Sequence, residues 1–296
     1  MNFTPRAFYD AVSSQLSSHS VAVCKDLSGV AGAIATQNFD LLGRRYVVLK
    51  NGQVVEKGIF KFHKSEITVH KGAVGDKYRC FYTYIKIVAN DEAEESASSA
   101  EDLKALLCSL KHHRLQIHLR SGTVGKNVQE FIRSLPFVSI FVVRSECEMT
   151  EDLLKTIQHL VEKKTLNIAE FATCDTKTVL DLLKQEQFER LLPRNLSPSL
   201  LYKIIEDWKV NAEKMAGKLL STPTSMKKLQ SVELITRITI GPCTEQEKAA
   251  YDINYPRVRG FLQGRTFTTL VSRNPTGRAI YWNFEREDSV LYLQFA

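Results

Sequence analysis

The sequence predicts an α+β protein whose larger part is a series of strand-then-helix units. Two observations carry this prediction: an apolar run of strand length at residues 135–143, and apolar residues at helical spacing directly after it. A third is that the same order recurs upstream and downstream. At 296 residues the chain is long enough for two domains. We divide it into a helical segment at 1–38, a β region at 39–89, an acidic linker at 90–102 and a strand-helix recognition domain at 103–296.

The helical segment begins near the amino terminus. Thr4 is a suitable helix cap and Pro5 stands at the first helical position. Phe8, Val12 and Leu16 then follow at intervals of four residues, which places them on one face of a helix. Such a stripe most often packs inside its own domain, but it also fits a surface on which a partner docks.

The β region is predicted from apolar runs that flank a turn. Asn51-Gly52 is a strong hairpin signal between the strands expected at 46–49 and 54–62. Residues 66–70 and 78–88 continue the pattern as a small antiparallel sheet. The following linker holds six acidic residues and no basic one, so we expect it to remain unstructured.

The strand-helix units recur at irregular steps. Leu135, Val138 and Ile140 fit the L-x-x-L-x-L pattern of leucine-rich repeats. The set of marker residues is Leu115, Val138, Leu166 and Val232, and their steps are 23, 28 and 66 residues. Two interpretations remain open: an irregular leucine-rich-repeat-like array, or an ordinary doubly wound α/β domain. Both require parallel strands with right-handed crossovers.

The last part of the chain changes back to antiparallel signals. Ser197-Pro198 opens a further helix, and residues 232–240 read as another strand. Strands expected at 266–272 and 278–284 flank the turn sequence at 273–277. We therefore expect the region to end in a small antiparallel sheet.

Composition narrows the functional classes. No apolar run has the length of a membrane span, and the first residues lack a secretory signal, so we expect an intracellular protein, cytoplasmic or nuclear. Six single cysteines without a C-x-x-C pair argue against a zinc ribbon. The net charge is +7, and +13 outside the acidic linker. Because the basic residues are scattered and no nucleic-acid motif accompanies them, a solvated surface is favoured over a nucleic-acid site.

No catalytic motif is present in the sequence. The glycine loop at 121–127 has Arg120 and Asn127 where a P-loop requires glycine and a hydroxyl residue. His112, His113 and His118 lack further ligands at metal-binding spacing. There is no nucleophile-elbow or protease signature. We therefore predict a non-enzymatic protein without a metal or cofactor.

The amino-terminal pattern resembles the opening of an F-box, L-P-x-E-x-x-x-x-I-x-x-x-L. Pro5, Val12 and Leu16 stand at matching positions, and Val23-Cys24-Lys25 is similar to the V-C-K of its later helix. Thr4 and Ala7 depart from the usual Leu and Glu, the gap to Val23 is short, and no Trp follows. The resemblance at motif level covers about 25 residues. The order of parts in the whole chain resembles the nematode F-box and F-box-associated (FTH-like) families.

This resemblance implies a substrate adaptor of a cullin-RING ubiquitin ligase. Pro5, Phe8, Val12 and Leu16 would dock on a Skp-type adaptor protein, while the strand-helix domain binds an unknown target protein. The alternatives are a protein-interaction module without ligase association and a basic nucleic-acid-binding protein. If docking is correct, Phe8, Val12 and Leu16 should be exposed in the isolated chain.

The target face follows from the strand pattern. We expect one group of side chains to point into the core: Leu115, Ile117, Val138, Ile140, Leu166 and Ile168. The target face is then formed by exposed strand and loop residues on one continuous surface: Gln116, His118, Arg120, Ser139, Arg144, Glu146 and Asn167. The strands that begin at Leu115, Val138 and Leu166 should be parallel neighbours in that order.

Overall fold

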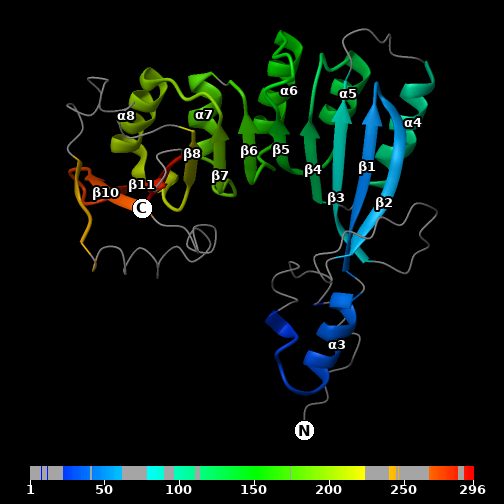
Figure 1. Ribbon diagram of the computed structural model, residues 1–296, viewed down its shortest axis with the longest axis horizontal. Helices are drawn as coiled ribbons and strands as arrows, with labels where there is room; N and C mark the ends of the chain where they lie inside the picture. Colours follow the sequence, from blue (N-terminus) through cyan, green and yellow to red (C-terminus); the bar gives the residue numbers. More distant parts are fainter. Residues whose placement is uncertain are drawn as a thin grey trace. The chain divides into compact units, whose positions relative to one another are not determined.

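The computed structural model describes residues 8, 12, 23–40, 42–61, 79–89, 97–110, 114–173, 175–223, 240–244, 246, 267–285 and 290–296 (Figure 1). It is a mixed α/β structure. The chain forms two compact units. Unit 1 comprises Met1–His118 and Gly125–Phe137, and unit 2 comprises Leu119–Val124 and Val138–Ala296.

Unit 1 is built on strands in the order β2-β1-β3-β4. Its elements are α3 (Gly29–Asp40), β1 (Leu42–Lys50), β2 (Gln53–Lys61), β3 (Arg79–Val88), α4 (Ala97–Ser109), β4 (Arg114–Leu119, whose last residue belongs to unit 2) and α5 (Lys126–Ser134). The β1–β2 hairpin turns at Asn51 and Gly52, whose φ angles are 50° and 79°. Positive φ at both turn residues suits Asn-Gly and matches strand twist, so the expected hairpin is confirmed.

The third strand of unit 1 corrects the predicted sheet. β3 pairs with β1 in parallel, with Tyr46 opposite Tyr84, so the β region is not wholly antiparallel. An antiparallel neighbour is favoured when a short turn joins two strands, but residues 62–78 separate β2 from β3. That length leaves β3 able to take the far edge of β1. The strand expected at 66–70 lies outside the described residues.

The predicted acidic linker overlaps a helix. Helix α4 begins at Ala97 and therefore occupies the second half of the expected linker at 90–102. Leu103, Leu106 and Leu110 are buried at helical spacing, and this apolar stripe stabilises the helix into the segment before it. The composition of the segment did not predict this helix, because acidic and small residues precede the leucines that are buried.

Unit 2 contains parallel strands followed by antiparallel ones. Its elements are β5 (Val138–Val143), α6 (Glu151–Glu162), β6 (Ile168–Phe171), α7 (Thr176–Leu183), β7 (Arg190–Pro193), α8 (Pro198–Met215), β8 (Leu219–Thr222), β9 (Ile240–Pro242), β10 (Phe267–Arg273), β11 (Ala279–Glu285) and β12 (Leu291–Phe295). The strand order is β5-β6-β7-β8-β12-β11-β10-β9. β5 to β8 are parallel, and β12 joins β8 antiparallel.

Side-chain caps fix where the helices of unit 2 begin. Thr150, Asp175 and Ser197 each accept a hydrogen bond from a backbone N–H three residues later. Pro198 stands in the first turn of α8, where its missing N–H costs nothing. The predicted alternation of strand and helix is therefore confirmed for β5 with α6 and for β6 with α7. Helices α6, α7 and α8 follow successive parallel strands, as Figure 1 shows.

A row of fully buried residues lies on one face of the parallel strands of unit 2. Phe141, Ala169 and Leu191 are opposite one another in register and are fully buried. We call this the covered face. Ile140, Ile168 and Arg190 form the next row on the other side, the open face, and are half-buried.

This arrangement corrects two predicted core positions and one surface position. Ile140 and Ile168 were expected in the core but lie on the open face, and Ser139 was expected on the surface but is buried on the covered face. The expected burial of Leu115, Ile117, Val138 and Leu166 is confirmed. A strand that is apolar at nearly every position shows no alternation of apolar and polar residues. The sequence then does not indicate which alternate residues face the core, and the assignment is easily shifted by one residue.

The predicted order of neighbouring strands is compared only for strands that lie within one unit, and there it agrees. β5 and β6 are parallel neighbours, as expected. The pairing expected between the strands at Leu115 and Val138 joins residues of different units and stays a prediction. The strand expected at 232–240 is described only from Ile240, where β9 begins.

The β10–β11 connection is a tight turn organised by one side chain. Asn274 Oδ1 accepts hydrogen bonds from Thr276 N (3.1 Å), Thr276 Oγ1 (2.8 Å) and Arg278 N (2.9 Å). Gly277 has a φ of +84°, a conformation that favours glycine. β11 then pairs antiparallel with both β10 and β12.

Within the described ranges, no helix is both long and apolar enough to cross a membrane.

Candidate partner-binding surfaces

Exposed apolar side chains are concentrated near the amino end of unit 1. Phe8 and Val12 are both helical and are 55% and 39% exposed. Val23, Leu27 and Val30 follow and are more than half exposed. In the part of the chain that the structure describes, eight large hydrophobic residues are exposed, and five of them lie in this segment. Apolar exposure of this kind makes the segment a candidate docking surface.

The predicted exposure of this segment is confirmed for the two residues that can be compared, and its docking role stays a prediction. Phe8 and Val12 are exposed, as docking requires. Pro5 and Leu16 lie outside the described residues. The following helix α3 behaves differently, because Ile34 and Ala35 are buried on its inner side while Val30 is exposed. Unit 1 thus buries one side of α3 and leaves apolar side chains before it uncovered.

A row of rings crosses three strands of unit 1. Tyr46 on β1 stacks on Tyr84 on β3 with ring centroids 5.5 Å apart, and Tyr84 contacts His118 on β4 at 4.6 Å. The three rings are half-buried. Gln116, two residues before His118, is buried. Of the two target-face residues predicted on β4, His118 is therefore accessible within a ring stack, and Gln116 offers little surface.

An arginine pair lies at the carboxyl ends of the parallel strands of unit 2. Arg144 follows β5 and Arg194 follows β7, and both bind Glu170 of β6 between them. Arg144 Nη1 donates to Glu170 Oε1 at 3.0 Å, and Arg194 donates to the same oxygen from Nε at 2.9 Å and from Nη2 at 2.7 Å. Arg144 Nε is buried without an acceptor among the described residues. We call Arg144, Glu170 and Arg194 the carboxyl-edge cluster.

Glu146 belongs to the same edge. Its carboxylate is exposed, and a hydrogen bond from its own backbone N–H is the largest cause of the lowering of its pKa. The positive charges of Arg194 and Arg144 lower the pKa further. Glu146 is therefore ionised at neutral pH beside two guanidinium groups, and this edge presents charges of both signs.

Two loops of unit 2 are tied together next to this cluster. Gly122 N donates to Glu146 O at 3.1 Å, and Glu148 N donates to Gly122 O at 3.2 Å. Thr123 Oγ1 donates to Glu148 Oε2 at 2.5 Å. These bonds fix the loop that begins at exposed Arg120 against the loop that holds Glu146. Three predicted target-face residues, Arg120, Arg144 and Glu146, therefore lie on adjoining loops.

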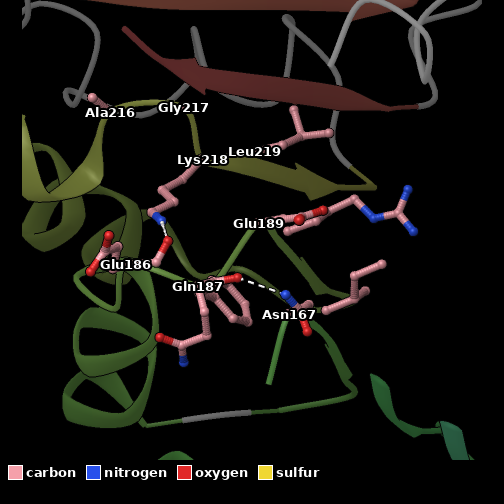
Figure 2. Close-up of a pocket in the computed structure, with 11 residues that line it drawn as sticks. Asn167, Glu186, Gln187, Glu189, Ala216, Gly217, Lys218 and Leu219 are labelled. Carbon is pink, nitrogen blue, oxygen red and sulfur yellow. Dashed lines mark hydrogen bonds between the residues drawn. The ribbon is translucent and has the colours of Figure 1, made fainter. Parts of the chain in front are cut away.

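Two further predicted residues of unit 2, Ser139 and Asn167, do not join this surface. Ser139 is buried on the covered face. Asn167 lies at the amino end of β6, opposite to the carboxyl-edge cluster, and its Nδ2 donates to Gln187 O at 2.9 Å inside a pocket (Figure 2). Gln116 and His118 belong to unit 1, so their place relative to this surface stays a prediction. The single continuous face predicted from the sequence is therefore wrong, since Ser139 points inward and Asn167 lies at the other end of the strands.

Glu170 and Arg194 were missed by the sequence argument. β7 is only four residues long, so Arg194 was not recognised as the first residue after a strand. Glu170 alternates with buried Ala169 and Phe171, which is a signal that it shares the open face. A search for a charged residue within a short alternating strand could have found it.

Among the described residues, no group of three or more His, Cys, Asp or Glu side chains is arranged to hold a metal ion. Comparison of the chain with protein-family models and with curated proteins finds no match.

Proposed function

We propose that this protein is a non-catalytic interaction protein, and that it acts as an F-box-like substrate adaptor of a cullin-RING ubiquitin ligase. The observation that carries the proposal is the exposure of Phe8 and Val12, two helical residues at the spacing of the F-box-like pattern. A helix that packed only within its own domain would bury such a pair. The wider group of exposed Val23, Leu27 and Val30 supports a docking surface for a Skp-type adaptor protein.

The strand-helix part of unit 2 is proposed to bind the target. Strands β5, β6, β7 and β8 begin at 138, 168, 190 and 219, so the steps are 30, 22 and 29 residues. These steps are close to the repeat length of leucine-rich repeats and support an irregular array of that kind. In such arrays the strands specify the fold, and residues at their ends and in the following loops contact the partner.

Within unit 2, we place the proposed target surface at the carboxyl ends of the parallel strands. Arg120, Arg144, Glu146 and Arg194 come from loops that follow the strands, where exposed side chains are free to differ between proteins without unfolding the sheet. Arginine is favoured in such interfaces because its planar fork makes two hydrogen bonds at once.

The proposal is tested by co-purification of the full chain with a recombinant Skp-type adaptor. Phe8→Asp and Val12→Asp should each abolish capture, because a carboxylate cannot enter an apolar interface without a large desolvation cost. Val210→Asp is the matched control: Val210 is 83% exposed on α8 in unit 2, and its substitution should leave capture unchanged.

The outcomes separate ligase docking from simple interaction. Loss of capture in the two amino-terminal variants but not in the control supports the adaptor. Equal capture by all variants, or no capture of any Skp-type protein by the wild-type chain, contradicts the adaptor function. In the second case the protein would remain a candidate interaction module without ligase association.

A further inference from the structure

A pocket of about 470 Å³ opens at the amino ends of β6, β7 and β8 in unit 2 (Figure 2). Its walls come from the loops before these strands: Asn167, residues 186–189 and residues 216–218. The first strand residues Ile168, Arg190 and Leu219 complete the lining. A pocket of this volume is within the range that holds small ligands, and it lies at the opposite end of the strands from the carboxyl-edge cluster.

Lys218 is the unusual residue of this pocket. It is only 6% exposed, and its Nζ donates to the backbone carbonyl oxygen of Glu186 at 2.8 Å, as Figure 2 shows. Burial lowers the pKa of its amino group. An ammonium group has three N–H donors and a buried charge normally has an anionic partner, yet Lys218 forms no ion pair with any described residue. The pocket therefore contains a buried cation with donors to spare.

The neighbouring side-chain amide groups already donate hydrogen bonds within the protein. Asn167 Nδ2 donates to Gln187 O at 2.9 Å, and Gln187 Nε2 donates to Gln185 Oε1 at 2.6 Å. These bonds hold the loop before β7 against the start of β6. The donors that remain for a ligand therefore come from Lys218.

The charges of the pocket lining favour a singly charged anion over a doubly charged one. Lys218 and Arg190 are balanced by Glu186 and Glu189. Burial lowers the pKa of Lys218, and the negative charges of the two carboxylates oppose this lowering without forming an ion pair with Lys218. A doubly charged anion would be repelled by the two carboxylates, whereas a singly charged one can bind at Lys218 alone. The lining also contains apolar side chains that suit a hydrocarbon group: Ile168, Phe188, Ala216 and Leu219.

We propose that this pocket binds a monocarboxylate with an apolar body, whose carboxylate accepts hydrogen bonds from Lys218. Two sources share this chemistry: a free small carboxylate and the carboxyl terminus of a polypeptide. The site is separate from the amino-terminal docking segment, so the inference goes beyond the proposed function and does not depend on it.

The test is a titration of the full-length chain, followed by ligand-observed NMR and calorimetry. The probes are hexanoate, 1-hexanol, and an acetylated tripeptide ending in leucine, as the free acid and as the amide. The variants are Lys218→Met and the control Lys209→Met, since Lys209 lies on the exposed side of α8 and pairs with Glu206. Lys218→Met should fold, because it replaces a buried charge with an apolar side chain of similar length; tryptophan fluorescence checks this.

We expect saturable binding of an acid and at least about tenfold weaker binding of its matched alcohol or amide, as for loss of a charge-assisted hydrogen bond. Lys218→Met should weaken acid binding by a similar factor, and Lys209→Met should not. Tighter binding of the peptide acid identifies a polypeptide terminus as the source, and equal or tighter binding of hexanoate identifies a free carboxylate. The proposal is overturned if neither acid binds, if the neutral analogues bind equally, or if Lys218→Met keeps the wild-type affinity. Should that variant fail to fold, Lys218→Gln replaces it, with the same expected weakening and the same contradicting results.

Discussion

Glu170 connects two strand ends of unit 2, and its removal gives a measurable loss of stability. The substitution Glu170→Ala deletes three hydrogen bonds, at 3.0, 2.9 and 2.7 Å, from Arg144 and Arg194. The side chains are 15% exposed for Glu170, 29% for Arg144 and 35% for Arg194, so the pairs are intermediate between surface and buried ones. An exposed pair contributes about 0–1 kcal/mol, and breaking a buried one costs about 3–5 kcal/mol. We expect unit 2 to lose about 1–3 kcal/mol.

The assay can follow unit 2 alone. The chain has two tryptophans, Trp208 and Trp282, and both are buried in unit 2. Their fluorescence during urea unfolding therefore reports on this unit. Glu170→Gln keeps one neutral acceptor oxygen and should lose roughly half as much as Glu170→Ala.

Glu213→Ala is the matched control for this experiment. Glu213 is a helical glutamate whose side chain is 87% exposed and 3.9 Å from Arg278. Its removal should change stability by less than about 0.5 kcal/mol. If Glu170→Ala costs no more than this control, the two arginines do not depend on Glu170 and the carboxyl-edge cluster is not a structural unit.

Two further predictions concern stability. Asn274→Ala should cost unit 2 about 1.5–3 kcal/mol in the same urea assay, because three donors of the β10–β11 turn lose their acceptor. Asn274→Asp keeps the acceptor and should lose less; equal losses would show that the side chain does not organise the turn. Burial raises the pKa of Cys147 to about 11 from 9.0, so stability should be full below pH 9 and fall as pH rises through 11. Cys147→Ala should remove about 1–2 kcal/mol of this alkaline loss, and identical pH profiles for the two proteins would contradict it.

Local signals in the sequence were sufficient where one or two residues decide the backbone. Asn51-Gly52 requires positive φ angles that few other pairs tolerate, and Ser197-Pro198 both caps and starts a helix. These positions form a turn and a helix start largely regardless of the rest of the chain. The same holds for Thr150, whose side chain caps α6. The number and order of strand-helix units could therefore be read in part before the structure was known.

Features that depend on distant partners could not be read in this way. β3 pairs in parallel with β1, and this pairing is made between strands that are distant in the sequence. No residue pattern within β3 specifies a parallel neighbour. Ile140 and Phe141 are both apolar, so only their burial in the folded structure shows that Phe141 is the core residue. The carboxyl-edge cluster joins residues from the ends of three strands. Arg144 was predicted on this edge, but its hydrogen bond to Glu170, which Arg194 shares, is seen only in the folded structure.

The place of β12 in the sheet affects how unit 2 reaches its folded state. This strand lies between β8 and β11, so Leu293 pairs with Leu220 across a long stretch of chain. Until residues 291–295 dock, β8 presents an unpaired edge, and unpaired edges recruit strands from other molecules. Closing such a distant contact is slow compared with forming a hairpin. The period before β12 docks is therefore when unit 2 is most prone to aggregate, and co-expression with a chaperone that shields strand edges should raise its soluble yield.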